Sequence, residues 1–370
     1  MLIVACISAH GFGHGSRSAA VLAALHQLEP HWRLVVSSAL PPPFLTMALD
    51  PVPFEHRPCQ WDVGVVQADA LGADPEATLE ALERLEQQLP GQIEAEASWL
   101  RAQGEPILVL GDVPPAAALL AQCLGAPLIW LASFGWDAIY GPMGPAFELW
   151  TQQAHGLYSQ GQLLLACPLA MPMAWGIPQV QLGLTAGKPR LQAGELASQL
   201  NLPGDPERSV LVSFGGLGID FDPRLLALWP DHVFVGPNPA LALAPNGRFL
   251  PEGVRPLEVM PHCRRLITKP GYSSFCEALE LGLGIHVVHR NGFAEAAVLE
   301  LALQRHGQHR LLSQGQWQRG EWQLDHPLVP PQGQPLLGGG CEQAAEAISG
   351  FVADGHGFAL QSKGQFFDWH

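Results

Sequence analysis

The sequence contains one local pattern twice: an apolar run, a glycine-rich loop and a segment with helical spacing. The first copy starts with the apolar residues 2–8 and enters a helix over 16–28. The second starts with the strand 210–214, and its helix begins at Asp222. Continuous apolar strands that alternate with helices are typical of parallel sheets covered on both faces. The pattern therefore predicts an α/β protein with two halves, and ligands of such folds lie beyond the carboxyl ends of the strands.

The length of 370 residues fits two or three domains. We predict a first domain over 1–167, a connection rich in Pro, Gly and Gln over 168–208, a second domain over 209–353 and a tail over 354–370. In the first domain Asp74 is expected to cap a long helix over 74–102, which Pro90 and Gly91 are expected to break.

Composition excludes several classes of protein. Hydrophobic residues make up 48% and charged residues 14%, which excludes a disordered polymer. The net charge is −15 and no Lys/Arg run occurs, so we predict no nucleic-acid partner. The net charge is −11 over 1–185 but −4 over 186–370, which favours the second half for an anionic ligand and argues against contact with anionic lipids. Scattered cysteines and the lack of a long apolar stretch favour a cytoplasmic protein without a transmembrane segment.

The first glycine loop carries two histidines, His10 and His14, which flank the glycines Gly11 and Gly13. Small residues allow close approach of the backbone, and a helix N-terminus offers free N–H groups, so the loop suits a phosphate. It matches neither the dinucleotide motif nor the Walker A motif, and no third metal ligand has recognisable spacing. Histidine titrates near neutral pH, which makes His14 a candidate general base. The alternative is a tight turn with two surface histidines.

Asp112 lies at the carboxyl end of a buried apolar strand over 107–110, at the same sheet edge as the His14 loop. A carboxylate behind an imidazole fixes its tautomer and stabilises the imidazolium. Asp112 is therefore the candidate partner of His14. The alternative is an ordinary N-cap of the helix that follows.

The most specific segment is a strand followed by Pro-Gly and a helix with two serines. Gly271, Ser273 and Ser274, with the free N–H groups of the helix start, would form a cradle for a diphosphate. Glu277, one turn into the helix, would accept both hydroxyls of a ribose. Ser274 and Glu277 also have the spacing of a capping box, which is the alternative.

A second candidate phosphate loop, with Gly215 and Gly216, follows the strand 210–214. Asp220 and Asp222 come next, in a D-x-D pattern that binds metal in some proteins. Asp222 precedes a proline, which is typical of an N-cap and the first residue of a helix. We therefore predict a cap and no metal site.

Together these motifs resemble a GT-B glycosyltransferase: Gly-His in the first loop, an Asp that ends a later strand, a double glycine, and P-G-x-S-x-x-x-E. The second half resembles the peptidoglycan N-acetylglucosaminyltransferases and the plant UDP-glycosyltransferases. The segments 10–17, 64–71, 111–113 and 136–140 are similar to the glycosyltransferase-like N-terminal region of L-arabinokinase. The likeness covers about residues 1–350, without the sugar-kinase domain of arabinokinase.

The resemblance implies two Rossmann-like domains that face each other across a cleft. His14 would be the base and Asp112 its partner, Glu277 would bind the ribose of UDP, and Glu295 would lie near the donor sugar. The residues Gly215, Gly216, Gly271, Ser273 and Ser274 would surround the diphosphate. Trp136 and Asp137 would line the acceptor side, although a buried tryptophan is the alternative. The tryptophan-glutamine platform of the plant enzymes is not recognisable, which leaves the donor open.

The expected reaction is an inverting, metal-independent transfer of a sugar from a nucleotide diphosphate, such as a UDP-sugar, to a hydroxyl acceptor. The expected partners are this donor and a small-molecule or glycan acceptor, with no further cofactor. Two alternatives stay open: a nucleotide-sugar epimerase on the same fold, and a nucleotide-sugar-binding protein without activity.

Overall fold

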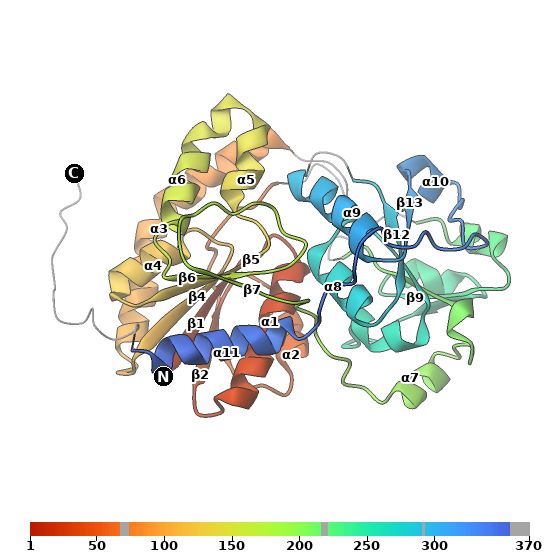
Figure 1. The fold of residues 1–370 in the computed structure, drawn as a ribbon, viewed down its shortest axis with the longest axis horizontal. Helices are drawn as coiled ribbons and strands as arrows, with labels where there is room; N and C mark the ends of the chain where they lie inside the picture. Colours follow the sequence, from red (N-terminus) through yellow and green to blue (C-terminus); the bar gives the residue numbers. More distant parts are fainter. Residues whose placement is uncertain (67–73, 216–220, 291–292, 356–370) are drawn as a thin grey trace.

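The computed structural model shows two α/β lobes, each built on one parallel sheet (Figure 1). It describes residues 1–66, 74–215, 221–290 and 293–355. The first sheet has the order β3-β2-β1-β4-β5-β6-β7, with β1 Leu2–Ile7, β2 Arg33–Ser37, β3 Glu55–Arg57, β4 Ile107–Asp112, β5 Leu128–Ala132, β6 Leu163–Ala166 and β7 Gln179–Gln181. The second has the order β10-β9-β8-β11-β12-β13, with β8 Ser209–Val212, β9 Val233–Gly236, β10 Gly247–Phe249, β11 Arg265–Thr268, β12 Gly284–Val288 and β13 His309–Leu312. The predicted α/β fold with two facing halves is confirmed.

Helices cover the two sheets. The first lobe carries α1 Phe12–Leu28, α2 Pro42–Leu49, α3 Pro75–Arg101, α4 Ala117–Leu124, α5 Trp136–Tyr140 and α6 Glu148–Tyr158, with the 3-10 turns 141–143 and 145–147. Further along the chain lie α7 Ala193–Gln199, α8 Tyr272–Glu280, α9 Ala294–His306, α10 Gln314–Gln318 and α11 Gly340–Ala353. The short 3-10 helices of this part are η3 Pro206–Arg208, η4 Pro223–Leu228, η5 Pro239–Leu243 and η6 Pro256–His262.

The central strands bring the predicted motifs to common sheet edges. All six residues of β1 are buried, and β1 pairs in parallel with β4 so that Ile7 lies opposite Asp112. The loop that follows β1 therefore lies beside the end of β4. In the second sheet β11 lies between β8 and β12, which places the loops after these three strands at one edge.

Two expectations about local structure were wrong. The helix over 75–101 begins as predicted, since Asp74 accepts a hydrogen bond from the N–H of Ala77 at 3.0 Å, but it runs through Pro90 without a break. Buried side chains on both sides of the proline, Leu82, Leu85, Ala97 and Leu100, hold the helix against the lobe. Their burial offsets the cost of an internal proline, about 3 kcal/mol. Residues 168–208 are also more than a connection, because they contain β7, which pairs with β6.

The last described helix, α11, returns from the second lobe and lies along α1 of the first (Figure 1). Its buried residues Cys341, Ala344, Ala345 and Ile348 belong to an apolar core that includes residues of both lobes. The chain crosses between the lobes at two places that lie side by side. The N–H of Leu184 donates to Leu337 O at 2.7 Å, and the N–H of Gly340 donates to Leu184 O at 3.0 Å.

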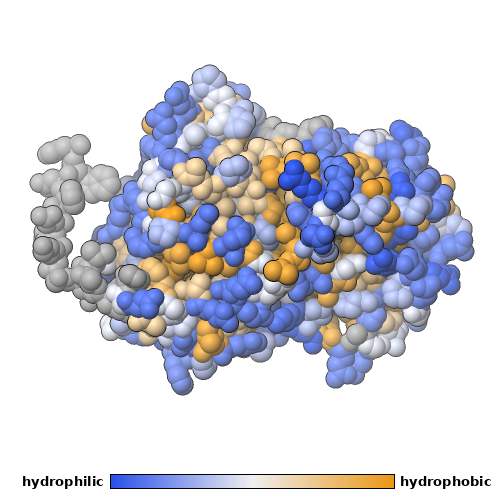
Figure 2. Space-filling model, in the orientation of Figure 1, coloured by the Kyte–Doolittle hydropathy of each residue, from blue (hydrophilic) through white to orange (hydrophobic). Residues whose placement is uncertain are grey.

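The surface is mainly hydrophilic on the face that Figure 2 shows, with hydrophobic patches among the polar residues. Among the described residues, no helix is both long and apolar enough to cross a membrane.

The tight packing of the first sheet predicts a stability effect at Gly111 of β4, where a Cβ would overlap the buried ring of Trp130. We expect Gly111→Ala to lower the free energy of unfolding by about 1–3 kcal/mol because the ring and the strand must move apart. Gly91 in α3 is the control, since a methyl group there meets no atom within 4 Å. Gly91→Ala should leave stability unchanged or raise it by up to about 1 kcal/mol. Urea unfolding of both variants is the measurement, and equal stability of Gly111→Ala and the wild type would contradict the packing argument.

Candidate functional site

The structure brings His14 and Asp112 together at the carboxyl ends of β1 and β4. Gly11 is the N-cap of α1, and His14 lies in the first turn of that helix. The Nδ1–H of His14 donates to Oδ1 of Asp112 at 3.0 Å. Asp112 is fully enclosed, whereas His14 keeps 11% of its side-chain surface exposed. The pair therefore has the arrangement of an imidazole base with a carboxylate behind it, with Nε2 as the basic nitrogen.

Arg17 holds the Asp112 carboxylate from the other side. Its Nε donates to Oδ2 at 3.1 Å and a second guanidinium N–H donates to Oδ1, while Ser18 Oγ donates to Oδ2 at 2.6 Å. Burial alone would raise the pKa of Asp112, but the charge of Arg17 and the hydrogen bond from His14 outweigh it and hold this pKa at about 2. Asp112 is therefore ionised at neutral pH. The sequence reasoning missed Arg17, although its position three residues after His14 places it on the same side of α1.

Arg17 also connects this site to the second lobe. Its guanidinium lies over the ring of Tyr272, 4.9 Å from the centroid, and its Nη1 donates to Ser133 Oγ at 2.9 Å. Ser133 in turn donates to Oε1 of Glu295 at 3.3 Å. Glu295 is buried, and burial raises the pKa of its carboxyl against the opposing charges of His14 and Arg17. Glu295 therefore lies within the polar network of the first lobe, next to the His14–Asp112 pair.

His10 has a different environment from His14. The N–H of Val65 donates to its Nδ1 at 3.3 Å, its ring stacks on Phe293 at 5.7 Å, and the edge of Trp136 lies at 5.2 Å. Burial, followed by the charges around it, lowers the pKa of His10 to about 3. His10 is therefore neutral, with one ring nitrogen already engaged, and is poorly suited to accept a proton.

Trp136 and Asp137 support the first lobe in this structure. Trp136 is fully buried and its indole N–H donates to Oδ2 of Asp62 at 2.7 Å. Asp137 accepts hydrogen bonds from Trp175 Nε1 at 3.1 Å and from His155 Nδ1 at 3.0 Å. These contacts fit the alternative interpretation, in which Trp136 is a buried residue of the first lobe. A role of Trp136 and Asp137 on the acceptor side stays a prediction.

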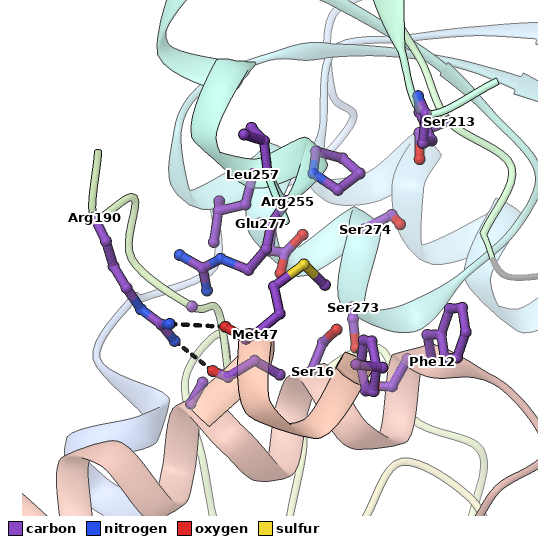
Figure 3. A pocket seen from close by; sticks show the side chains of 18 of the residues that line it. Phe12, Ser16, Met47, Arg190, Ser213, Arg255, Leu257, Ser273, Ser274 and Glu277 are labelled. Carbon is purple, nitrogen blue, oxygen red and sulfur yellow. Dashed lines mark hydrogen bonds between the residues drawn. The ribbon is translucent and has the colours of Figure 1, made fainter. Parts of the chain in front are cut away.

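A cavity of about 1360 Å³ lies between the two lobes. On the first lobe α1 contributes one face, and on the second lobe the loops after the strands and the start of α8 contribute most of the wall (Figure 3). His14 and Arg17 point from the other side of α1, toward Asp112. Gly13 lines the cavity and precedes His14 directly, so the His14 loop forms the border between the cavity and the His14–Asp112 pair. The α1 residues at the cavity are Phe12, Gly13, Ser16, Ala20, Ala23, Ala24, His26 and Gln27.

The predicted diphosphate cradle lies at the start of α8. Gly271 is the N-cap and provides no side-chain hydrogen bond, so the capping box of Ser274 and Glu277 does not form. Ser273 and Ser274 line the cavity, and Ser273 Oγ donates to the carbonyl of Gly13 at 2.7 Å. The two loops that the sequence predicts to bind phosphate therefore touch each other across the lobes.

Glu277 also faces the cavity, beside Arg255 and Leu257 (Figure 3). Burial raises the pKa of Glu277 to about 7, and the nearby charge of Arg255 offsets this only in part. A partly buried carboxyl with a pKa near neutral pH that faces a cavity is typical of a ligand-binding position. The sequence reasoning did not identify Arg255.

The loop after β8 is described only in part. Gly215 lines the cavity in a left-handed conformation with φ of 75°, whereas Gly216 and Asp220 lie outside the described residues. Asp222 caps η4, because its Oδ1 accepts from the N–H of Arg224 at 3.0 Å, which confirms the cap interpretation. The described part of the chain contains no group of three or more His, Cys, Asp or Glu side chains placed to hold a metal ion.

Comparison with known proteins gives one curated relative, the L-arabinokinase of Arabidopsis thaliana. The chain is 25% identical to it over 307 residues, which are 80% of this chain. The chain spans only 29% of the length of that protein. No protein family model matches the sequence.

Solved structures of glycosyltransferases resemble most of the chain. A UDP-glucosyltransferase from Polygonum tinctorium matches with a TM-score of 0.60 at 14% identity, over 98% of this chain and 95% of that one. A UDP-glucose:anthocyanidin 3-O-glucosyltransferase in complex with UDP also matches with a TM-score of 0.60, at 13% identity, over 95% of this chain and 94% of that one. The calicheamicin glycosyltransferase matches with a TM-score of 0.57, at 15% identity, over 95% of this chain and 94% of that one. The chain therefore has the fold of the GT-B UDP-glycosyltransferases, as the sequence motifs predicted.

Proposed function

We propose that this protein is a glycosyltransferase that moves a sugar from a nucleotide diphosphate, a UDP-sugar, to a hydroxyl acceptor. The observation that carries the proposal is the position of the His14–Asp112 pair at the border of a large interlobe cavity whose other wall is the cradle at α8. The GT-B fold and the glycosyltransferase names of the similar structures support the same reaction.

The proposed reaction inverts the anomeric carbon. Nε2 of His14 takes the proton of the acceptor hydroxyl, and the acceptor oxygen forms a bond to the anomeric carbon from the side opposite the diphosphate. The bond from that carbon to the phosphate oxygen breaks, and its electron pair leaves with the nucleoside diphosphate. Asp112, kept ionised by Arg17, stabilises the imidazolium that forms.

The donor would lie along the second lobe. Glu277 would accept the two ribose hydroxyls, and Glu295 would bind hydroxyls of the transferred sugar. Gly271, Ser273, Ser274 and Gly215, with Gly216, would surround the diphosphate. The N–H groups at the start of α8 favour negative charge, so the leaving diphosphate would need no metal ion.

Glu277 gives a test of donor binding. We expect Glu277→Ala to bind UDP about 10- to 100-fold more weakly, because hydrogen bonds to a charged group contribute about 1.5–3 kcal/mol. Since the carboxyl has a pKa of about 7 and the ribose prefers its ionised form, the affinity of the wild type for UDP-glucose should rise from pH 6 to pH 8. Glu277→Gln should remove that pH dependence. Calorimetry is the measurement, with Glu280→Gln, on the exposed side of the same helix, as the control; unchanged UDP affinity in folded Glu277→Ala would reject the ribose role.

The dependence on metal ions can be tested directly. Asp222 is engaged as a helix cap and pairs with Arg224, so we expect transfer activity to survive EDTA. Loss of activity in EDTA that Mn²⁺ restores would show that the proposed reaction needs a metal.

The buried pair of Arg17 and Asp112 predicts a stability effect. Arg17→Met should lower the free energy of unfolding by about 3–5 kcal/mol, because it leaves a buried carboxylate without its cation. The double variant Arg17→Met/Asp112→Asn should regain part of that loss. Arg319→Gln, which breaks the exposed pair with Glu321, is the control and should change stability by less than about 1 kcal/mol. Urea unfolding measures all three, and equal losses for the single and the double variant would contradict the argument.

The general base is tested by three variants. His14→Ala should lower kcat about 10²- to 10⁴-fold while the donor still binds, because the acceptor hydroxyl is a poor nucleophile until its proton is removed. Asp112→Asn should have a milder effect, through the orientation of the imidazole. His10→Ala should matter less than His14→Ala, because His10 is neutral and its Nδ1 is occupied. Near wild-type turnover of His14→Ala, or a far larger loss in His10→Ala, would remove His14 from the role of base.

A further inference from the structure

Two basic residues follow neighbouring strands of the second sheet. Lys269 comes directly after β11, and Arg290 comes two residues after β12. The strands pair in parallel, with Thr268 opposite Val287, so the two residues emerge at the same sheet edge. This edge faces the His14 loop of the first lobe, because Ser273 reaches Gly13 there.

Both cations lie in a mostly enclosed place. Arg290 is 9% exposed, and its guanidinium lies over the ring of Phe293, 4.7 Å from the centroid. The same ring stacks on His10 of the first lobe. Burial, and then the charge of Arg290, lowers the pKa of Lys269 to about 8. The two cations therefore lie close enough to repel each other, at the boundary between the lobes.

Among the described residues, the amine of Lys269 has no hydrogen bond and no ion-pair partner. Removal of an ammonium group from water costs free energy unless an opposite charge compensates it, and a second cation beside it adds to that cost. Glu295 is close enough to Arg290 for their charges to interact, and its Oε1 accepts a hydrogen bond from Ser133. An unneutralised cation of this kind is typical of a site that an anionic ligand completes.

We propose that Lys269 and Arg290 bind an oxyanion at the junction between the diphosphate and the transferred sugar. The proposal rests on the proposed function for the identity of the donor and names a further recognition element of that site. Lys269 precedes the cradle residues Gly271 and Ser273, and Arg290 precedes the sugar-side residue Glu295. Lys269 therefore lies close along the chain to the groups assigned to the phosphates, and the charge of Arg290 acts on the carboxyl of Glu295, which is assigned to the sugar.

Two parts of a nucleotide-sugar carry an oxyanion at this place. One is the β-phosphate, which receives the electron pair of the breaking bond, so that two cations beside it would lower the energy of the leaving group. The other is a carboxylate on the transferred sugar, as in a uronic acid, which would make the pair a determinant of donor specificity. Both are bound through the same charge-assisted hydrogen bonds.

The first experiment compares the wild type with Lys269→Met, Arg290→Met and Lys269→Arg by calorimetry. The ligands are UDP, UMP, UDP-glucose, UDP-glucuronate and inorganic pyrophosphate. If the pair holds the β-phosphate, each Met variant loses about 10- to 100-fold in affinity for UDP and pyrophosphate but not for UMP. If it holds a sugar carboxylate, UDP and UDP-glucose bind as before and only UDP-glucuronate weakens. Lys269→Arg, which keeps the charge, should regain part of the affinity.

Arg319→Gln is the matched control for loss of one positive charge away from the cleft, and its affinities should equal those of the wild type. Unchanged affinity of both Met variants for every ligand that the wild type binds would overturn the proposal. Failure of the wild type to bind any uridine nucleotide would overturn the proposed function instead. In that case the pyrophosphate titration still tests the oxyanion site. If the wild type binds pyrophosphate and Lys269→Met does not, the oxyanion site is supported. If the wild type does not bind pyrophosphate, the oxyanion site is overturned as well.

The wild type gives a second measurement that does not depend on the folding of a variant. The chain contains three lysines, Lys188, Lys269 and Lys363, so mass spectrometry can follow the acetylation of each amine. At pH 8 the amine of Lys269 is partly unprotonated and should react. UDP or pyrophosphate should slow its acetylation at least severalfold relative to the other two lysines if the pair holds the β-phosphate, and only UDP-glucuronate should do so if the pair holds a sugar carboxylate. Equal rates at Lys269 without a ligand and with each of these three ligands bound would contradict the proposal.

Discussion

The ion pair of Asp112 with Arg17 is the interaction on which the rest of the site depends. A carboxylate at the end of a central strand, enclosed by the sheet and α1, is stable only because a guanidinium and Ser18 satisfy its oxygens. Its ionised form then fixes the Nδ1–H of His14 and leaves Nε2 as the nitrogen that we propose to be the base. Because the Arg17 guanidinium also lies over the ring of Tyr272, this side chain connects the Asp112 carboxylate of the first lobe to α8 of the second lobe.

The lobes meet through polar and apolar contacts with different roles. Ser133 with Glu295, and Ser273 with Gly13, connect the strand-end loops around the candidate site. The apolar core below them is continuous between the lobes and includes residues of α1, α8 and α11. The aromatic cluster around the buried Trp136 extends across the lobe boundary, because Phe293 of the second lobe contacts His10 and Phe134. The role of Trp136 on the acceptor side stays a prediction.

Much of this architecture could be predicted because it follows from local patterns. Apolar runs with glycine loops predicted both sheets, and strand order places the end of β1 beside Asp112. Three features could not be predicted in this way. Pro90 lies inside a helix because distant side chains hold both halves, and α11 packs on α1 across about 320 residues of chain, as the bond from Ser349 to Glu29 shows. The closeness of Lys269 to Arg290 depends on the pairing of β11 with β12, which the sequence around either residue does not reveal.

The side-by-side crossings of the chain at Leu184 and at Leu337–Gly340 determine how the lobes can move. Two adjacent backbone segments tied by hydrogen bonds would restrict the lobes to a hinge motion about the line through these segments, because a twist that separates the segments would break those bonds. Gly183 and Gly340 pack directly on the opposite segment, which leaves no room for larger side chains along this axis. Since α11 lies beyond the hinge, it would travel with the first lobe. Opening would then separate the loops of Gly13 and Ser273, which are joined by a hydrogen bond in this structure.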